Sequence, residues 1–167
     1  MSGFLPFMFN NRLSVARPRV YAFFHALRAA QGATLPIGAA GFCWGGKYVF
    51  ELCSDSEKAS NGKSLIDCGF TAHPSGLAIP QDAEAVTKPL SVAVGDADFV
   101  MPLAQVETTR EILRKKGDVH EVVVFPGAKH GFAVRGPPDD EKAVEQGKQA
   151  EDQAVKWFEK WFGQVAG

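Results

Sequence analysis

The sequence lacks an excess of charge of either sign, a long apolar run and a recognisable leader. Its 18 Lys and Arg residues balance 19 Asp and Glu residues to a net charge of −1, which argues against nucleic acid or an anionic membrane as the partner. No apolar run approaches the roughly 18 residues that span a bilayer. The apolar stretch at 1–9 lacks the basic region and the small-residue cleavage site of a secretory signal.

Cysteine is scarce as well. The three cysteines, Cys43, Cys53 and Cys68, form an odd number and include no C-x-x-C pair and no spacing typical of a metal site. This pattern argues against a disulfide framework. It predicts a chain without a bound metal in a reducing, cytoplasmic setting.

What the sequence contains is an alternation of short apolar segments with longer segments of helical periodicity. We expect strands over 36–43, 65–73, 90–95 and 120–127, and helices over 19–31, 47–53, 103–117 and 141–162. Strands this apolar are typical of a parallel sheet whose two faces are covered by helices. Because 167 residues with 46% apolar content suffice for one domain, the sequence predicts an α/β domain over 19–167 after a segment of uncertain structure at 1–18.

Chemistry in such a sheet is expected beyond the carboxyl ends of the strands. The first of these ends carries GFCWGG, residues 41–46, with Cys43 between glycines. A cysteine here is either a small buried side chain in a tight turn or a nucleophile presented by a sharp strand–turn–helix elbow. In the second case the helix N-terminus lowers the pKa of the thiol and offers the N–H of Trp44 to an oxyanion.

Two carboxylates and a histidine follow later strand ends. The segment GDADFVMP carries Asp96 and Asp98, and the segment FPGAKHGFAVRG carries His130. Taken alone, such an aspartate is usually a helix cap and such a histidine a solvated loop residue. The order nucleophile, acid, histidine is that of the α/β-hydrolase triad, and it favours Cys43 as the nucleophile.

These motifs carry a family resemblance. GFCWGGKY, VGDADFVMP and FPGAKHGFAVRG resemble the three motifs of the dienelactone hydrolase family, and the resemblance covers about residues 19–162. It implies an α/β-hydrolase-like fold, with Cys43 as nucleophile, His130 as general base and Asp98 as the acid. Asp98 is preferred over Asp96 because it stands four residues before a proline, as in the family pattern G-x-x-D-x-x-x-P.

The same resemblance implies the substrate class. Arg135 lies close to a family arginine that binds a substrate carboxylate, and Phe42, His73 and Phe99 are expected to contact the substrate, although His73 could instead only cap a strand end. Ser75 is a poor rival nucleophile because no glycine stands two residues before it. The implied reaction is hydrolysis of an activated ester or enol lactone, a small molecule, without cofactor or metal.

The chain departs from the family at its start. Only 42 residues precede Cys43, whereas family members place three or more strands there, a loop that supplies a second oxyanion N–H, and an acidic residue that restrains the cysteine. We therefore expect an N-terminally shortened member whose nucleophile strand has an unpaired edge. That edge would recruit a second copy, the first ten residues of the same chain or a separate fragment, and a homo-oligomer is our prediction.

Two other function classes remain open. One is a binding or regulatory protein that keeps the fold without turnover. The other is a thiol-redox protein that uses Cys43 with peroxide. Cys53, the nearest partner thiol, is expected to face the core, which argues against the second class.

Overall fold

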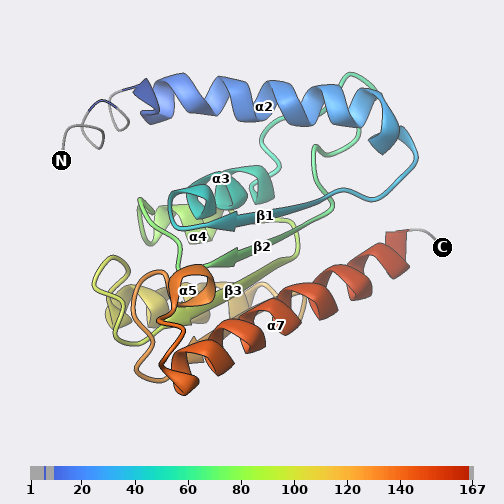
Figure 1. Cartoon of the computed structure of the whole chain (residues 1–167). Helices are drawn as coiled ribbons and strands as arrows, with labels where there is room; N and C mark the ends of the chain where they lie inside the picture. Colours follow the sequence, from blue (N-terminus) through green and yellow to red (C-terminus); the bar gives the residue numbers. More distant parts are fainter. Residues whose placement is uncertain (1–5, 7–9, 166–167) are drawn as a thin grey trace.

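Four strands form one parallel sheet in the computed structural model, which describes residue 6 and residues 10–165 (Figure 1). The strands lie in sequence order: β1 (Gly38–Phe42), β2 (Cys68–Ala72), β3 (Leu90–Gly95) and β4 (His120–Phe125). In the register, Phe42 lies opposite Ala72 and Gly95 opposite Phe125, so the carboxyl ends of the strands meet at one end of the sheet. The predicted α/β fold with a parallel sheet is confirmed.

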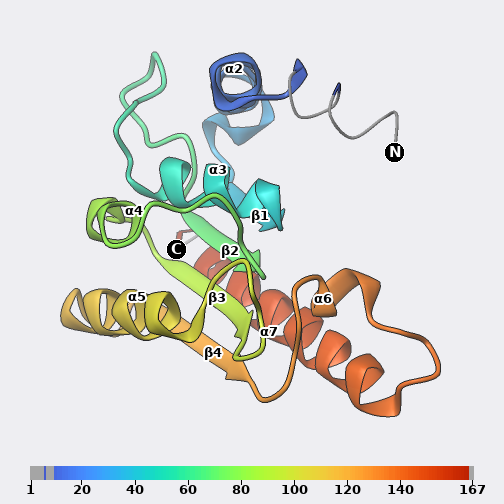
Figure 2. The ribbon, with the colours of Figure 1, turned by 90° about the vertical axis from the view of Figure 1, so that its left-hand side faces the viewer.

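Helices cover both faces of this sheet (Figure 2). One face carries α3 (Trp44–Cys53), α4 (Gln81–Ala85) and α5 (Leu103–Lys115), and the other carries the long α7 (Glu141–Val165) with the short α6 (Phe132–Arg135) before it. Each face has its own apolar cluster: Val49, Phe50 and Val106 belong to the first, and Phe70 and Trp157 to the second. The 5-residue α4 and the 4-residue α6 were not predicted, because one turn of helix is too short to show a periodicity.

The strand β1 differs from the two central strands. Every residue of β2 and β3 is buried, whereas Ala40 and Phe42 of β1 are exposed. The expectation that β1 is buried on both faces is therefore wrong. The rings of Phe158 and Phe162 in α7 lie against Gly38, so α7 covers the beginning of β1 and leaves its later residues open.

The helix α2 (Leu13–Ala29) begins six residues before the predicted start at 19 and contains Pro18 in its interior. Tertiary contacts explain this extension: Ala16 is buried, and the guanidinium of Arg17 lies 3.2 Å from a carboxylate oxygen of Glu51 in α3. Phe23 in this helix is 61% exposed although it is apolar. The helix thus crosses the expected boundary at 18, and residues 1–5 and 7–9 lie outside the described part of the chain.

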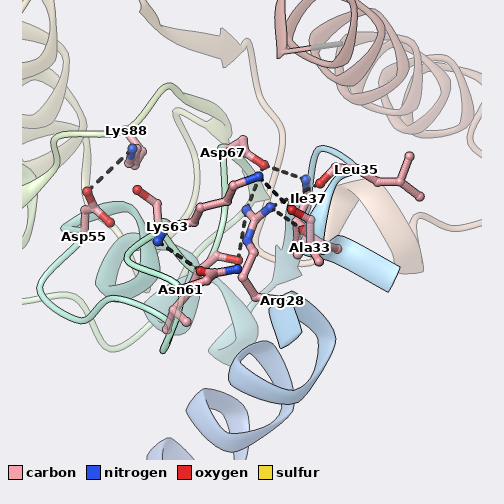
Figure 3. Close-up of polar contacts among 12 residues, drawn as sticks. Arg28, Ala33, Leu35, Ile37, Asp55, Asn61, Lys63, Asp67 and Lys88 are labelled. Carbon is pink, nitrogen blue, oxygen red and sulfur yellow. Dashed lines mark hydrogen bonds and ion pairs between the residues drawn. The ribbon is translucent and has the colours of Figure 1, made fainter. Parts of the chain in front are cut away.

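A buried ion pair ties the end of α2 to the amino ends of the strands (Figure 3). Arg28 donates to the carbonyl oxygens of Gly32 at 2.9 Å and Leu35 at 3.1 Å, and it lies 2.8 Å from Asp67 Oδ2. The same Asp67 oxygen accepts the N–H of Ile37 at 2.7 Å. Because Ile37 and Asp67 directly precede β1 and β2, this cluster sets how the two strands enter the sheet.

No helix within the described ranges is long and apolar enough to cross a membrane.

Candidate active site

The residue after β1 sits on a sharp turn. The backbone φ angle of Cys43 is 52°, a value that residues other than glycine rarely adopt. Cys43 directly precedes α3. A Cβ on Gly41 would lie 2.5 Å from the carbonyl oxygen of Gly45, and a Cβ on Gly46 would lie 2.5 Å from Thr71 Oγ1. Only glycine fits at both positions. The predicted strand–turn–helix elbow is therefore present, with Cys43 at its tip.

The three side chains expected to form a triad lie in one hydrogen-bonded row. His130 Nε2 is 3.1 Å from Cys43 Sγ, and His130 Nδ1 is 2.9 Å from Asp98 Oδ2. Asp98 follows β3, and His130 lies in the loop between β4 and α6. Each residue therefore reaches the row from the end of a different strand, and one imidazole nitrogen faces the carboxylate while the other faces the sulfur.

Asp98 rather than Asp96 is the carboxylate beside the histidine. Asp98 is 2% exposed and also accepts the N–H of Val100 at 2.8 Å, so its acceptor oxygens are well supplied with donors. Asp96 is exposed and accepts the N–H of Gly127 at 2.6 Å instead. Asp96 thus holds the turn between two strand ends together, and within the described part of the chain its carboxylate makes no hydrogen bond with His130.

The surroundings shift the pKa values of Cys43 and His130 in opposite directions. Burial alone would raise the pKa of the Cys43 thiol, but hydrogen bonds from His130, from Ser75 and from the N–H of Trp44 outweigh it and lower the pKa. Burial alone would lower the pKa of His130, but its hydrogen bonds to Cys43 and Asp98 raise the pKa. Both shifts favour a thiolate beside an imidazolium.

Four further residues were expected to contact a substrate. The structure places three of them at the surface and the fourth, His73, in the interior. Phe99 is 83% exposed, and its ring centroid lies 6.3 Å from that of His130. Phe42 is exposed beside Cys43. Arg135 is also exposed and lines, with His130, a cavity of about 290 Å³ between the histidine loop and α7.

His73 lies elsewhere than the mouth of the site. Its side chain has no exposed area, and its ring centroid is 5.1 Å from that of His130 and 5.9 Å from that of Phe132 in edge-to-face contacts. Burial is the main reason that the pKa of His73 falls to about 4. His73 is therefore a neutral ring packed beneath the histidine that contacts the thiol, and a substrate reaches it only if these rings move.

Sequence reasoning missed Ser75 as a part of this site. Ser75 Oγ lies 3.7 Å from Cys43 Sγ, and the Ser75 N–H donates to the carbonyl oxygen of Cys43 at 2.9 Å. Ser75 was considered only as a nucleophile, and in that role the absence of an elbow around it told against it. Its place just after β2, at the same end of the sheet as the other site residues, was the available signal.

Comparison with known proteins identifies the family. A model of the dienelactone hydrolase family matches residues 8–165. Hydrolase tropI of Talaromyces stipitatus is 33% identical over 126 residues, which cover 75% of this chain and 46% of that protein. A carboxymethylenebutenolidase homolog of Xenopus tropicalis is 28% identical over 131 residues, with 75% and 49% covered.

Solved structures show the same fold. The acylaminoacyl peptidase of Pyrococcus horikoshii superposes with a TM-score of 0.58 at 16% identity, over 77% of this chain and 24% of that one. The chain spans about half the length of the curated relatives it matches. Since the family model covers nearly the whole chain, the chain belongs to the dienelactone hydrolase family.

Proposed function

We propose that the protein hydrolyses an activated carboxylic ester or enol lactone with Cys43 as the nucleophile. The observation that carries this proposal is the hydrogen-bonded row of Asp98, His130 and Cys43, with the sulfur on a strained elbow at the N-terminus of α3. A nucleophile, a base in contact with it and a carboxylate that orients the base are the three parts that acyl transfer requires.

Acylation begins with the Cys43 thiolate. The sulfur attacks the carbonyl carbon, and the N–H of Trp44 stabilises the oxyanion that develops. As the tetrahedral intermediate collapses, the carbon–oxygen bond to the alcohol or ring oxygen breaks. The proton on His130 passes to that leaving oxygen, which yields a thioester and a neutral imidazole.

Deacylation uses the same groups in reverse. His130 takes a proton from water as the water oxygen attacks the thioester carbon, and the carbon–sulfur bond then breaks to release the acid and restore the thiolate. Asp98 accepts the Nδ1–H throughout, so it holds the ring in one tautomer and offsets its positive charge. None of these steps needs a metal or an organic cofactor.

The substrate class follows from the nucleophile and its surroundings. A thiolate favours esters with good leaving groups, such as enol lactones, over amides. Phe99 places an exposed aromatic ring near the imidazole, and Phe42, which directly precedes Cys43 in the chain, is exposed as well. Arg135 places a guanidinium in the cavity beside His130, and we assign it to a carboxylate of the substrate.

The test is hydrolysis of p-nitrophenyl acetate and of an enol lactone by the wild type beside Cys43→Ala and Cys53→Ala. We expect turnover in the wild type and in Cys53→Ala, and none above background in Cys43→Ala. Mass spectrometry of the quenched wild type should show an acyl group on the peptide that contains Cys43. Equal hydrolysis by the two variants would contradict the proposal.

The alternatives predict different results. A family member that binds without turnover would show ligand binding with no acyl-enzyme. A thiol-redox protein that resolves an oxidised Cys43 within its own chain would need a second thiol within reach, but Cys53 and Cys68 have no exposed area. Burial raises the pKa of Cys68 to about 12, which makes it a poor partner for disulfide exchange.

We also propose that the protein is a cytoplasmic homo-oligomer joined through β1. Within the described residues, no strand pairs with the outer edge of β1, and on one face of this strand Ala40 and Phe42 are exposed. A second copy is the occupant we favour, because a twofold axis gives both edges a partner at once and a net charge of −1 offers little repulsion. The cytoplasmic part of the proposal rests on the scarcity and spacing of the three cysteines, which is typical of a reducing compartment. Sedimentation of the pure protein tests the assembly, and a stable monomer at high concentration would contradict it.

A further inference from the structure

The turn after β2 is held against the nucleophile by contacts that do not involve the side chains of the triad. The N–H of His73 donates to Ala93 O at 2.8 Å, which fixes the beginning of the turn to β3, and the N–H of Ser75 donates to Cys43 O at 2.9 Å. Between them, Pro74 occupies the space that a side chain on Gly46 would need, since a Cβ there would lie 2.6 Å from Pro74 Cβ. The turn and the elbow are thus packed backbone to backbone.

This packing brings a hydroxyl to the sulfur from a different element than the imidazole. Ser75 Oγ lies 3.7 Å from Cys43 Sγ, and His130 Nε2 lies 3.1 Å from it. A thiolate has lone pairs and no proton, so a hydroxyl in contact with it can only donate. Ser75 makes no other side-chain hydrogen bond among those of the described residues, so no acceptor in that part of the protein competes for its proton.

We propose that Ser75 is a further catalytic residue whose hydroxyl donates a hydrogen bond to the Cys43 thiolate and keeps the nucleophile ionised before any substrate binds. This inference deepens the proposed function and rests on it for its catalytic meaning. The hydrogen bond itself exists whether or not the chain turns over an ester. Hydrogen bonds to a charged group are about twice as strong as those between neutral groups, which is why one hydroxyl shifts the balance between thiol and thiolate.

The proposal has a consequence that a purely structural role for Ser75 does not share. Stabilising a thiolate increases its population but lowers its intrinsic nucleophilicity, which follows the thiol pKa with a coefficient of about 0.4–0.5. Loss of the hydroxyl should therefore slow reactions of Cys43 at neutral pH, where the thiolate population limits the rate. At a pH high enough to ionise the thiol in both proteins, the variant should react as fast as the wild type or faster.

The experiment is the rate of iodoacetamide alkylation of Cys43 across pH, followed by mass spectrometry, for the wild type, Ser75→Ala and Ser75→Thr. Ser60→Ala makes the same chemical change at an exposed position far along the chain and serves as the matched control. We expect Ser75→Ala to alkylate roughly threefold more slowly at neutral pH and its profile to cross that of the wild type at high pH. Ser75→Thr, which keeps a hydroxyl, and Ser60→Ala should follow the wild type.

A Ser75→Ala profile that coincides with the wild type, or that lies below it by one factor at every pH, would overturn the proposal. Alkylation needs no ester, so this result is independent of turnover. If the profiles cross but neither ester nor lactone is hydrolysed, Ser75 keeps its role at the thiolate and the proposed function fails. If esters are hydrolysed and the profiles coincide, the function stands and the role of Ser75 falls.

Discussion

Two polar clusters lie at opposite ends of the same sheet, and they are built in different ways. At the amino ends, Arg28 is 2% exposed, and its hydrogen bonds go to main-chain carbonyls and to the carboxylate of Asp67 (Figure 3). At the carboxyl ends, Asp98, His130 and Cys43 bond to one another through their side chains. The first cluster contacts the backbone and the second mainly contacts itself.

This difference distinguishes a cluster that stabilises the fold from a cluster that can react with a ligand. The terminal nitrogens of the Arg28 guanidinium donate to fixed carbonyls and to a carboxylate, and the side chain is closed off from solvent, so a ligand cannot reach it. Its removal leaves unpaired groups in the interior. The carboxyl-end cluster has its polar atoms in a row that ends in a partly exposed sulfur, so the last member can meet a substrate. We therefore expect changes at one end to alter stability and changes at the other to alter turnover.

The largest expected effect is on turnover. Asp98→Asn should lower kcat on the order of 10⁴-fold, because the amide no longer fixes the imidazole tautomer. Asp96→Asn, at the exposed turn, is the matched control and should change kcat far less. Steady-state kinetics and a thermal unfolding curve of each variant measure both properties. The reverse ranking would assign the acid to Asp96 and break the comparison.

The next effect is on thiol reactivity. Hydrogen bonds lower the pKa of Cys43, whereas burial raises the pKa of Cys68 to about 12 and that of Cys53 still higher. At pH 8 a thiol of pKa 12 is ionised to only about one part in 10⁴, and the higher intrinsic reactivity of its thiolate offsets about two decades of this difference. We therefore expect iodoacetamide to label Cys43 at least ~10²-fold faster than the other two. Peptide mapping reads all three rates in one sample. Equal labelling would remove Cys43 from the proposed role.

At the other end of the sheet, Arg28→Met should lower the free energy of unfolding by about 3–5 kcal/mol, because Asp67 is left without its buried partner. Arg17→Met removes a guanidinium from the same helix, where the ion pair with Glu51 is half-exposed, and should cost less than about 1 kcal/mol. Urea denaturation measures both. If hydrolysis is established, kcat per folded molecule should be unchanged in each variant, and a selective loss in Arg28→Met would show that the two ends are coupled.

The smallest expected effect concerns His73, which shares a property with each of the two clusters. His73 is buried like the scaffold but touches His130 in the site. Its folded-state pKa of about 4 lies below the ordinary value of 6.5, so the unfolded chain binds a proton that the folded chain refuses. Stability is therefore full above pH 6.5 and falls as the pH drops towards 4, by on the order of 3 kcal/mol.

Replacing the ring tests this directly. His73→Phe should flatten the dependence of the unfolding free energy on pH between about 6.5 and 4, and His25→Phe, at a partly exposed site on α2, should keep it. Urea denaturation at a series of pH values gives both slopes. An unchanged slope in His73→Phe would mean that another group is responsible.

Sequence reasoning reached the parts of the molecule whose signals are local. The strand at 90–95 was predicted with the bounds that β3 has, because a short apolar run between turns identifies a buried strand. The elbow, the acid and the histidine were found because each motif directly follows a strand. The start of α2 was missed because Pro18 is a local stop signal, and the burial of Ala16 and the contact of Arg17 with α3 override it.

The rest of the site depends on contacts between segments that a linear pattern does not report. Ser75 reaches the sulfur because Gly46 lets the following turn approach α3. Phe42 is exposed because α7 crosses β1 near Gly38 and leaves the end of the strand uncovered. The periodicity of the α7 sequence does not indicate where this crossing lies. The burial of His73 follows from Phe132 and His130 closing over it. Each of these outcomes depends on packing contacts between two or more helices, strands or loops.

The sequential order of the strands has a consequence for how the molecule assembles. Each strand pairs with its neighbour along the chain, so the sheet can grow one crossover at a time without a long closure between distant segments. The row of Cys43, Asp98 and His130 nevertheless draws on the ends of β1, β3 and β4. It is complete only after the last strand has docked. A contact between His130 and Cys43 therefore reports that β4 has joined β1, β2 and β3, and a chain arrested with only those three strands in place would have the elbow and no base.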